Sequence, residues 1–287
     1  TGRRFVTTYH GAYNEGSRLK NLYNSVMARG DAVIANSEYT AALIAERHPF
    51  AARRIVTVHR GVDLTLFAED ASARGAALRR AWDVAPGRPI LLNVARLTAW
   101  KGQEVLIEAL GRLAADAPAL DAVCVLAGDD QGRTDYRDRL VRRAEALGVA
   151  ERLRIVGHVD DVPGALAAAT VGVQPSIEPE AFGRAAVEVQ AAGLPVVVAD
   201  LGAVRETVLA APEADDSHRT GWRVPPGDAA ALAAAMHEAL TLPPEERAEI
   251  GRRGRIHADA NFSLGAMKTK TLRVYHSLLE DRDSALY

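Results

Sequence analysis

The chain has 287 residues, enough for one large or two ordinary domains, and its apolar content of 48% is ordinary for a globular protein with a sizeable core. Its formal net charge of −2 argues against a general nucleic-acid binder, because such proteins need a basic surface. The sole cysteine, Cys124, excludes a disulfide framework, and the sequence shows neither a signal peptide nor an apolar run of ~18 residues, so we expect a cytoplasmic protein with a buried, inert thiol.

Short apolar runs recur along most of the sequence and are rich in valine, isoleucine and leucine. In chain order, the candidate strands are Phe5–Tyr9, Ala32–Ala35, Arg54–Val58, Ile90–Val94, Ala122–Ala127, Leu153–Val156, Val171–Gln174 and Val196–Ala199. These runs do not alternate polar and apolar residues, which is typical of parallel strands covered on both faces.

Helical patterns fall between these strands. The segment Gly102–Asp116 repeats apolar residues at helical spacing, and the segment Asp135–Leu147 is charged outside and stops at Gly148, a usual C-terminal signal. Ser37 is typical of an N-cap, and Glu38 suits the first turn of the helix that would follow. The alternation of strands and helices predicts an α/β protein with an open parallel sheet and right-handed crossovers.

The organisation changes near Arg60-Gly-Val-Asp63. Residues 1–62 hold too few elements to bury a parallel sheet on both faces, so we expect a partial N-terminal Rossmann-like domain whose beginning is missing. Residues 63–262 can form a complete doubly wound domain. Residues 263–287 are predicted to form a final helix that packs back on the N-terminal part. Its single apolar stripe consists of Leu264, Met267, Thr271, Val274 and Leu278.

Glu180 and Glu188 carry the clearest chemical signal. Glu180 follows the apolar run Val171–Gln174 in a strand-to-helix loop, and Glu188 lies roughly two turns further along. The helix N-terminus between them would offer free backbone N–H groups to an anion. This layout suits a nucleotide-diphosphate sugar, which has two hydroxyl-bearing ends and an anionic middle. An exposed ion pair with Arg184, four residues before Glu188, is the alternative.

Arg96 and Lys101 lie on the loop after the strand Ile90–Val94. Ligands bind beyond the carboxyl ends of the strands in open α/β sheets, so two cations beside a helix N-terminus predict a phosphate site there. Ordinary surface charge is the alternative. His10 ends the first strand, where a structural role competes with a role in the site. The histidines show no paired ligand spacing, so we expect no metal site.

Together these residues resemble the retaining, nucleotide-sugar-dependent glycosyltransferases of family 4, which have the two-domain GT-B fold. The matching stretches are Tyr9-His10-Gly11, Arg60-Gly-Val-Asp63 followed by Phe67, Asn93-Val-Ala-Arg96 through Lys101-Gly102, and the E-x7-E element Glu180–Glu188 followed by Gly193-Leu-Pro195. The resemblance implies metal-independent transfer of a hexose, with retention and without a cofactor, from a nucleotide-diphosphate sugar to a glycan or lipid-linked acceptor. Asn14 through Tyr39 further resembles bacterial members that build lipopolysaccharide core or other envelope glycans.

The resemblance also implies roles for the charged residues. Arg96 and Lys101 would bind the diphosphate and stabilise its charge as it leaves. Glu188 would hold the ribose hydroxyls, and Glu180 would meet the hydroxyls of the donor sugar. Catalysis would then be mostly electrostatic, with closure of the two domains excluding water.

The remaining implied contacts involve the backbone and the N-terminal domain. The backbone N–H groups of Phe182 and Gly183 would lie near the sugar and phosphates, and His10 would approach the sugar from the N-terminal domain. The nucleobase would rest against the backbone around Val159 and Asp160.

The sequence departs from the family in two places. The glycine-rich loop of the first domain is absent along with that region, so we expect a fragment that binds donor, with loss of transfer activity as the alternative to an active enzyme. The family's paired glycines read Gly202-Ala203 here, which puts the loop geometry near the donor sugar in question. A nucleotide-sugar epimerase of the same fold and a truncated, non-catalytic nucleotide-sugar-binding module are the alternative functions.

Charge is unevenly distributed along the chain. Residues 1–60 hold nine lysines and arginines against four acids. This excess is typical either of a solvated surface or of a face that meets an anionic acceptor or an anionic membrane. An anionic membrane, met peripherally at the inner face of the cell membrane, is therefore among the expected partners.

Overall fold

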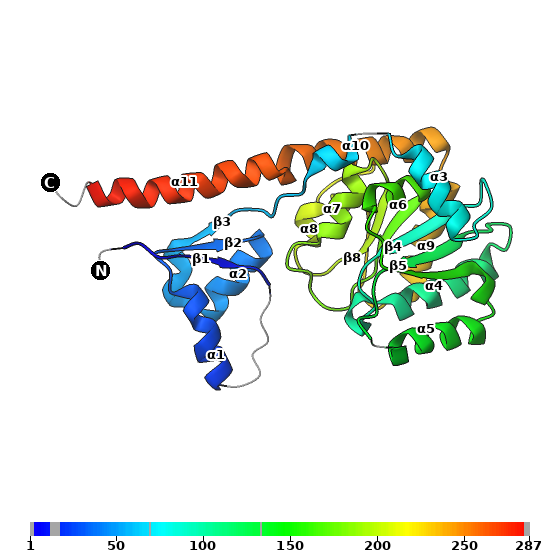
Figure 1. The fold of residues 1–287 in the computed structure, drawn as a ribbon, viewed down its shortest axis with the longest axis horizontal. Coiled ribbons are helices and arrows are strands. Elements are labelled where there is room, and N and C mark those ends of the chain that lie inside the picture. The colour runs from blue at the N-terminus through cyan, green and yellow to red at the C-terminus, as the bar shows by residue number, and fades with distance from the viewer. Residues whose placement is uncertain (1–2, 12–17, 69, 133, 284–287) are drawn as a thin grey trace.

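The structure is a computed structural model that describes residues 3–11, 18–68, 70–132 and 134–283. It contains two parallel sheets, each with its own helices (Figure 1). We call the part built on the first sheet the first lobe and the part built on the second sheet the second lobe. Of the stretch Asn14–Tyr39, residues 14–17 lie outside the described residues.

The first lobe contains a three-stranded parallel sheet in the order β1-β2-β3. Its strands and longer helices are β1 (Val6–Tyr9), α1 (Arg18–Ser25), β2 (Ala32–Ala35), α2 (Glu38–Arg47) and β3 (Ile55–Thr57). Each strand lies within one residue of its predicted bounds. Ser37 caps α2 as predicted, because its side chain accepts a hydrogen bond from the backbone N–H of Thr40.

The second lobe contains a six-stranded parallel sheet in the order β6-β5-β4-β7-β8-β9. Its strands are β4 (Ile90–Val94), β5 (Val123–Ala127), β6 (Leu153–Gly157), β7 (Val171–Gln174), β8 (Val196–Ala199) and β9 (Gly221–Val224). The first five lie within one residue of their predicted bounds. The edge strand β9 was not predicted, because its four residues, Gly-Trp-Arg-Val, contain only one of the valine, isoleucine and leucine residues that are frequent in the other strands of this sheet.

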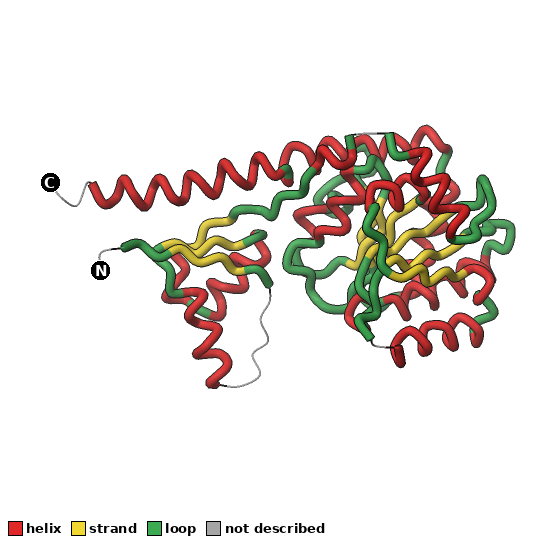
Figure 2. The backbone as a smooth tube through the Cα atoms, in the orientation of Figure 1, coloured by secondary structure: helices red, strands yellow, loops and turns green. Residues whose placement is uncertain are grey.

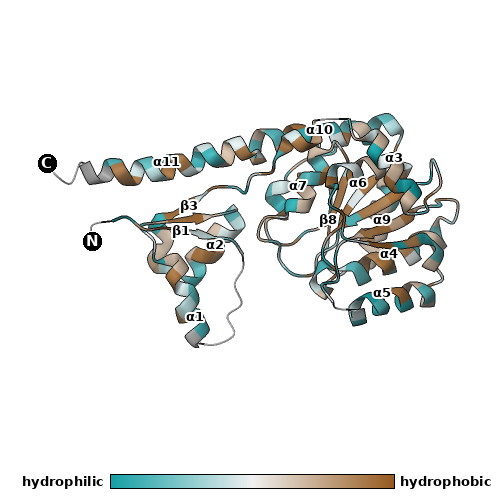
Figure 3. Cartoon of the chain, viewed as in Figure 1, coloured by the Kyte–Doolittle hydropathy of each residue, from teal (hydrophilic) through white to brown (hydrophobic). Residues whose placement is uncertain are grey.

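Helices cover both faces of this sheet and bury a hydrophobic cluster on each (Figure 2). One face carries α4 (Gln103–Asp116), α5 (Thr134–Ala146) and α9 (Ala229–Thr241), and the other carries α3 (Ser72–Ala81), α6 (Val162–Ala168), α7 (Arg184–Ala191) and α10 (Pro244–Phe262). The strands between them are strongly apolar (Figure 3). Cys124 is fully buried in this interior, and burial raises the pKa of its thiol to about 12, in keeping with an inert thiol.

Two chain segments run between the lobes, side by side. The backbone N–H of Val62 donates to the carbonyl of Phe262 at 2.8 Å, and the N–H of Leu264 donates to the carbonyl of Val62 at 3.1 Å. The helix α11 (Leu264–Asp283) then runs back along the first lobe (Figure 1), where Val274 packs with buried side chains of β2. Among the described helices, none is both long and apolar enough to cross a membrane.

The strand order places a switch point between β4 and β7. The chain leaves β4 outward through β5 and β6, returns to β7 beside β4, and continues outward on the other side through β8 and β9. The loops that follow β4 and β7 therefore diverge from the carboxyl ends of these two strands. Such a crevice is where open α/β sheets bind ligands.

Candidate functional site

A cavity of about 460 Å³ opens at this switch point. The predicted site residues that line it are Arg96, Lys101, Glu180, Gly183 and Glu188. Both cations lie on the segment after β4, and Glu180 and Gly183 lie on the loop after β7, so the topology brings the two groups to one edge of the sheet. Two acids and two cations thus share one cavity.

Lys101 and Glu180 form the central charged pair of this cavity. The Lys101 Nζ lies 2.5 Å from Glu180 Oε1, and the hydroxyl of Ser176 donates to the same oxygen at 2.7 Å. Both charged side chains are mostly buried, with exposed fractions of 14% and 17%. The ammonium also lies 4.0 Å from the centroid of the Trp100 ring, close enough for a cation–π contact. The cation is therefore held in place, and an incoming anion would compete with Glu180 for it.

The loops after β4 and β7 are joined through their backbones. The backbone N–H of Ile177 donates to the carbonyl of Trp100 at 2.8 Å. Gly102 adopts a φ of +71°, and a Cβ atom there would lie 1.9 Å from the carbonyl oxygen of Pro175. Only glycine fits this contact, because any side chain would push the loop of Lys101 away from the loop of Glu180.

The backbone of Glu180 is held by the segment that departs from the family pattern. Gly202 has a φ of +74°, and a Cβ atom there would lie 2.4 Å from the carbonyl oxygen of Glu180. Ala203 has an ordinary backbone conformation, with φ −76° and ψ 4°, and its N–H donates to the same carbonyl at 2.9 Å. Position 202 thus requires glycine and position 203 does not, so Ala203 leaves the contact with the Glu180 carbonyl intact.

Glu188 both forms an ion pair with Arg184 and lines the cavity, the two alternatives that its sequence context left open. Its Oε1 accepts a hydrogen bond from Arg184 Nε at 2.7 Å, so the intrahelical ion pair is present. Its side chain is only 13% exposed, however, whereas that of Arg184 is 59% exposed. Burial raises the pKa of Glu188, and the positive charges of Arg184 and Arg60 offset this only in part. A carboxylate that is costly to ionise therefore lines the cavity.

The N-terminus of α7 also faces this cavity. Gly183 is its N-cap, with a φ of +79° and no side-chain hydrogen bond to the first turn. Gly183, Arg184, Ala185 and Ala186 all line the cavity. The backbone N–H groups of a helix's first turn have no partner within the helix, and the helix dipole favours an anion in front of them.

Four predicted site residues do not line the cavity. His10 is exposed at the end of β1 in the first lobe, where its carbonyl accepts a hydrogen bond from Asn36 Nδ2 at 3.3 Å. The Phe182 ring is buried against Phe262, with ring centroids 5.5 Å apart. Their predicted roles in contacting the donor sugar remain predictions.

The other two residues lie on the loop after β6. Val159 packs on the hydrophobic cluster of the sheet face that carries α7. Asp160 is exposed, and its carboxylate lies 3.0 Å from Nε2 of His158. Val162, just beyond them, does line the cavity. This loop is therefore close to the site, and base binding by its backbone stays a prediction.

A buried polar network that adjoins the cavity was not predicted from the sequence. The hydroxyl of Tyr136 donates to Gln103 Oε1 at 3.0 Å, and Gln103 Nε2 donates to the carbonyl of Arg96 at 3.0 Å. Asn93 Nδ2 donates to the carbonyl of Val173 at 2.8 Å, which ties β4 to β7. Asn93 and Gln103 are fully buried. The available signal was the polar side chain of Asn93 within the apolar strand Ile90–Val94, whereas Gln103, between Gly102 and Glu104, gave none.

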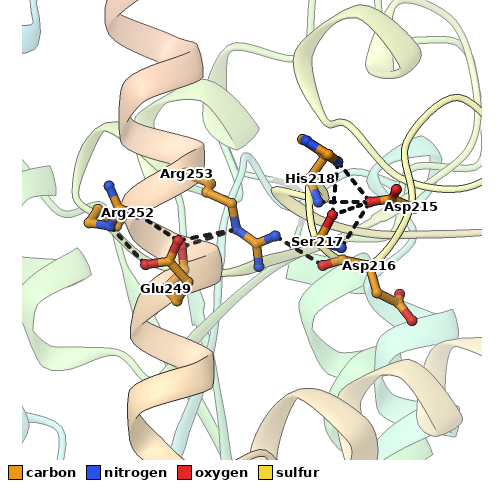
Figure 4. A network of polar contacts seen from close by, with 7 residues as sticks. All are labelled: Asp215, Asp216, Ser217, His218, Glu249, Arg252 and Arg253. Atoms are coloured by element: carbon orange, nitrogen blue, oxygen red, sulfur yellow. Dashed lines mark hydrogen bonds and ion pairs between the residues drawn. The ribbon is translucent and has the colours of Figure 1, made fainter.

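A serine, a histidine and an aspartate also meet outside this cavity (Figure 4). The hydroxyl of Ser217 and the carboxylate of Asp215 both contact Nδ1 of His218, at 2.9 Å and 2.8 Å. A nucleophilic relay needs the two groups on different ring nitrogens, so this arrangement is not a hydrolase triad. Its visible effect is local, since hydrogen bonds from Ser217 and then His218 lower the pKa of Asp215 to about 2. Among the described residues, no group of histidine, cysteine and acidic side chains is arranged to hold a metal ion.

Two family descriptions match the chain. Residues 76–257, more than half of the chain, match the family described as glycosyl transferases group 1. Residues 1–66 match the family described as glycosyltransferase family 4.

Relatives and solved structures agree with these matches. D-inositol 3-phosphate glycosyltransferase 2 of Catenulispora acidiphila is 32% identical over 272 residues, which are 92% of this chain and 60% of that protein. The chain thus spans less than two thirds of this relative. A glycosyltransferase from Rickettsia africae superimposes with a TM-score of 0.86 at 30% identity, over 97% of this chain and 72% of the other. HepE of Anabaena in complex with UDP-glucose superimposes with a TM-score of 0.81 at 26% identity, over the same two shares.

Proposed function

Because the chain belongs to the group 1 glycosyl transferases, the GT-B enzymes of family 4, we propose that it moves a hexose from a nucleotide-diphosphate sugar to a glycan or lipid-linked acceptor. The observation that carries the proposal is the cavity at the β4–β7 switch point, where Arg96, Lys101, Glu180, Glu188 and a helix N-terminus converge. The neighbour that was solved with UDP-glucose makes UDP-sugars the first donors to test.

The diphosphate would bind between Arg96, Lys101 and the first turn of α7. Its negative charge would compete with Glu180 for the Lys101 ammonium, since those two groups lie 2.5 Å apart without a ligand. Glu180 would then accept a hydroxyl of the donor sugar. The same cations and backbone N–H groups would stabilise the charge that develops on the leaving diphosphate, an effect for which one donor is typically worth about 10²- to 10³-fold in rate.

Glu188 would bind the ribose hydroxyls. The second lobe already holds its carboxylate at the cavity, and the exposed Arg184 can turn to solvent when two hydroxyls replace it. The base would lie along the loop that contains Val159 and Asp160. In this proposal the reaction uses no metal and retains the anomeric configuration, with His10 approaching from the first lobe.

We further propose a functional division of the chain that follows its sequence. Residues 1–62 would face the acceptor, residues 63–262 would bind the donor, and residues 263–287 would complete the acceptor-facing part. The packing of Val274 against β2 supports the last assignment.

Titration calorimetry with UDP, GDP and ADP tests the donor site. We expect micromolar binding of one nucleotide that is lost in Glu188→Ala and in Lys101→Ala. Glu178→Ala, which removes an exposed carboxylate from the loop after β7, is the matched control and should bind normally. Unchanged affinity in both site variants contradicts the proposal. Isomerisation of a nucleotide sugar without any acceptor would instead indicate an epimerase.

Exposed apolar side chains and nearby arginines of the first lobe support a proposal of peripheral membrane contact. Several large apolar side chains of this lobe are exposed: Phe5, Leu22, Tyr23, Val26 and Phe50. The guanidinium groups of Arg29 and Arg54 each lie 6.0 Å from the centroid of the Phe50 ring. We propose that the first lobe meets an anionic acceptor or the inner leaflet. Sedimentation with anionic vesicles at low salt tests the membrane contact, and protein that stays entirely in the supernatant contradicts it.

A further inference from the structure

Glu206, on the short helix α8 (Val204–Thr207) of the second lobe, binds the first lobe through three hydrogen-bonding partners. Its two carboxylate oxygens accept from the backbone N–H groups of Glu38 and Tyr39, each at 2.8 Å. His59 Nε2 lies 2.8 Å from the same carboxylate. Because Glu38 and Tyr39 begin α2, the carboxylate satisfies orphan donors at that helix N-terminus and meets the positive end of its dipole.

The same turn of α2 holds the loop of the candidate site. The hydroxyl of Ser37 donates to the carbonyl of Ala181 at 2.7 Å, and the hydroxyl of Thr40 approaches the same carbonyl at 3.3 Å. Both hydroxyl-bearing residues are fully buried. Ala181 directly follows Glu180, so two side chains from one lobe support the backbone next to a charged group of the other.

The second lobe holds the preceding peptide, whose carbonyl belongs to Glu180. Gly202 pairs with Glu180, and the N–H of Ala203 donates to the Glu180 carbonyl at 2.9 Å. α8 follows Ala203 immediately and carries Glu206. The chain from Gly202 to Glu206 therefore touches the Glu180 loop at one end and the start of α2 at the other.

We propose that Glu206 is a positioning residue that clamps the start of α2 to the second lobe and thereby fixes the loop of Glu180 in its donor-binding position. The inference rests on the proposed function of Glu180 and goes beyond it, because Glu206 lines no part of the cavity. By linkage, whatever strengthens the clamp strengthens binding of the donor sugar, and bound donor strengthens the clamp.

The electrostatics of Glu206 support the clamp. Burial alone would raise the pKa of its carboxyl group, but the hydrogen bonds from His59 and from the N–H groups of Tyr39 and Glu38 outweigh it and hold the pKa below its usual value. The group therefore stays ionised at neutral pH. A neutral amide at this position would keep the size of the side chain and lose the charge that binds the helix N-terminus.

Two variants break the clamp at different points. Glu206→Gln removes its charge, and the double variant Ser37→Ala with Thr40→Val removes the hydroxyls that hold Ala181. The matched control is Glu178→Gln, which neutralises an exposed acid in the same loop as Glu180. None of these changes alters a residue that lines the cavity.

Hydrogen exchange without ligand gives the first readout. We expect the amides of residues 176–183 to exchange faster in both clamp variants than in wild type, with exchange of β4 and of the Glu178→Gln control unchanged. The second readout is affinity. UDP-glucose binding should weaken about fivefold to tenfold, in line with one or two lost hydrogen bonds, while UDP binding changes less than about twofold.

The outcomes separate the clamp from the proposed function. Unchanged exchange of residues 176–183 in both variants overturns the clamp. If exchange is faster but the affinities for UDP and UDP-glucose fall equally, the positioning of Glu180 is overturned, because general loosening of the loop then explains both results. If the wild-type protein binds none of UDP, GDP and ADP, the proposed function is wrong, and the exchange measurement alone decides the clamp.

Discussion

Replacing Gly202 by alanine should damage the candidate site from a distance. The new Cβ atom would lie 2.4 Å from the carbonyl oxygen of Glu180 and 2.7 Å from its nitrogen, at a φ of +74°. The left-handed backbone costs an alanine about 1–2 kcal/mol, and moving the crowded backbone of Glu180 costs roughly another 1–3 kcal/mol. We expect the free energy of unfolding, measured with urea, to fall by roughly 2–5 kcal/mol in total. The substitution should also weaken binding of UDP-glucose more than it weakens binding of UDP.

A matched control isolates the contact from the backbone strain. Gly227 has a nearly identical φ of +76°, but a Cβ atom there would have nothing within 4 Å. Gly227→Ala should therefore cost only the strain, about 1–2 kcal/mol, and leave ligand binding unchanged. Ala203→Gly, which restores the family's glycine pair, should shift stability by no more than about 1 kcal/mol. Equal effects of Gly202→Ala and Gly227→Ala on stability and on UDP-glucose binding would refute the reasoning.

The other predictions concern three glutamates. Glu180→Ala should lower turnover more than nucleotide affinity in an active full-length form, and equal losses in both would contradict its assignment to the sugar. Glu188 has a raised pKa in the folded protein, first because of burial, so its contribution to stability is present in acid and is lost as pH rises through that pKa. Glu188→Gln should therefore raise the thermal midpoint at pH 7 but not at pH 4, and an equal gain at both values argues against the buried carboxylate. Glu206 has a lowered pKa, because its hydrogen bonds outweigh burial, so its contribution is present at neutral pH and is lost as pH falls through that pKa. Glu206→Gln should cost about 2–4 kcal/mol at pH 7 and less in acid, as followed by urea unfolding, and a cost independent of pH would count against the charge.

Much of the fold could be predicted because parallel strands have a strong local signature. The eight predicted strands are all present, with nearly the predicted ends. The edge strand β9 was not predicted, because its tertiary packing rather than its composition makes it a strand. Trp222 and Val224 pack in the core, while Arg223 donates hydrogen bonds to the loop carbonyls of Ala210 and Ala211.

The candidate site was partly predictable for a topological reason. Residues that follow β4 and β7 meet because the carboxyl ends of neighbouring parallel strands lie at one sheet edge. Sequence spacing says nothing about the contact between Lys101 and Glu180, which lie 79 positions apart.

The contacts between lobes were beyond prediction. Ser37 was identified as a cap, but its second bond, to Ala181, depends on how the lobes sit against each other. The same holds for Glu206, whose partners Glu38 and Tyr39 lie more than 160 positions away. Local patterns specify a helix N-terminus, and only the tertiary arrangement decides which carboxylate reaches it.

A crystal structure of the chain with an intact nucleotide sugar, starting with UDP-glucose, tests the central claim most directly. We predict that diphosphate oxygens lie within hydrogen-bonding distance of Arg96 and Lys101, that the ribose hydroxyls contact Glu188, and that the hexose hydroxyls reach Glu180. A donor bound elsewhere on the molecule, or in this cavity with its diphosphate away from both cations, would contradict the account.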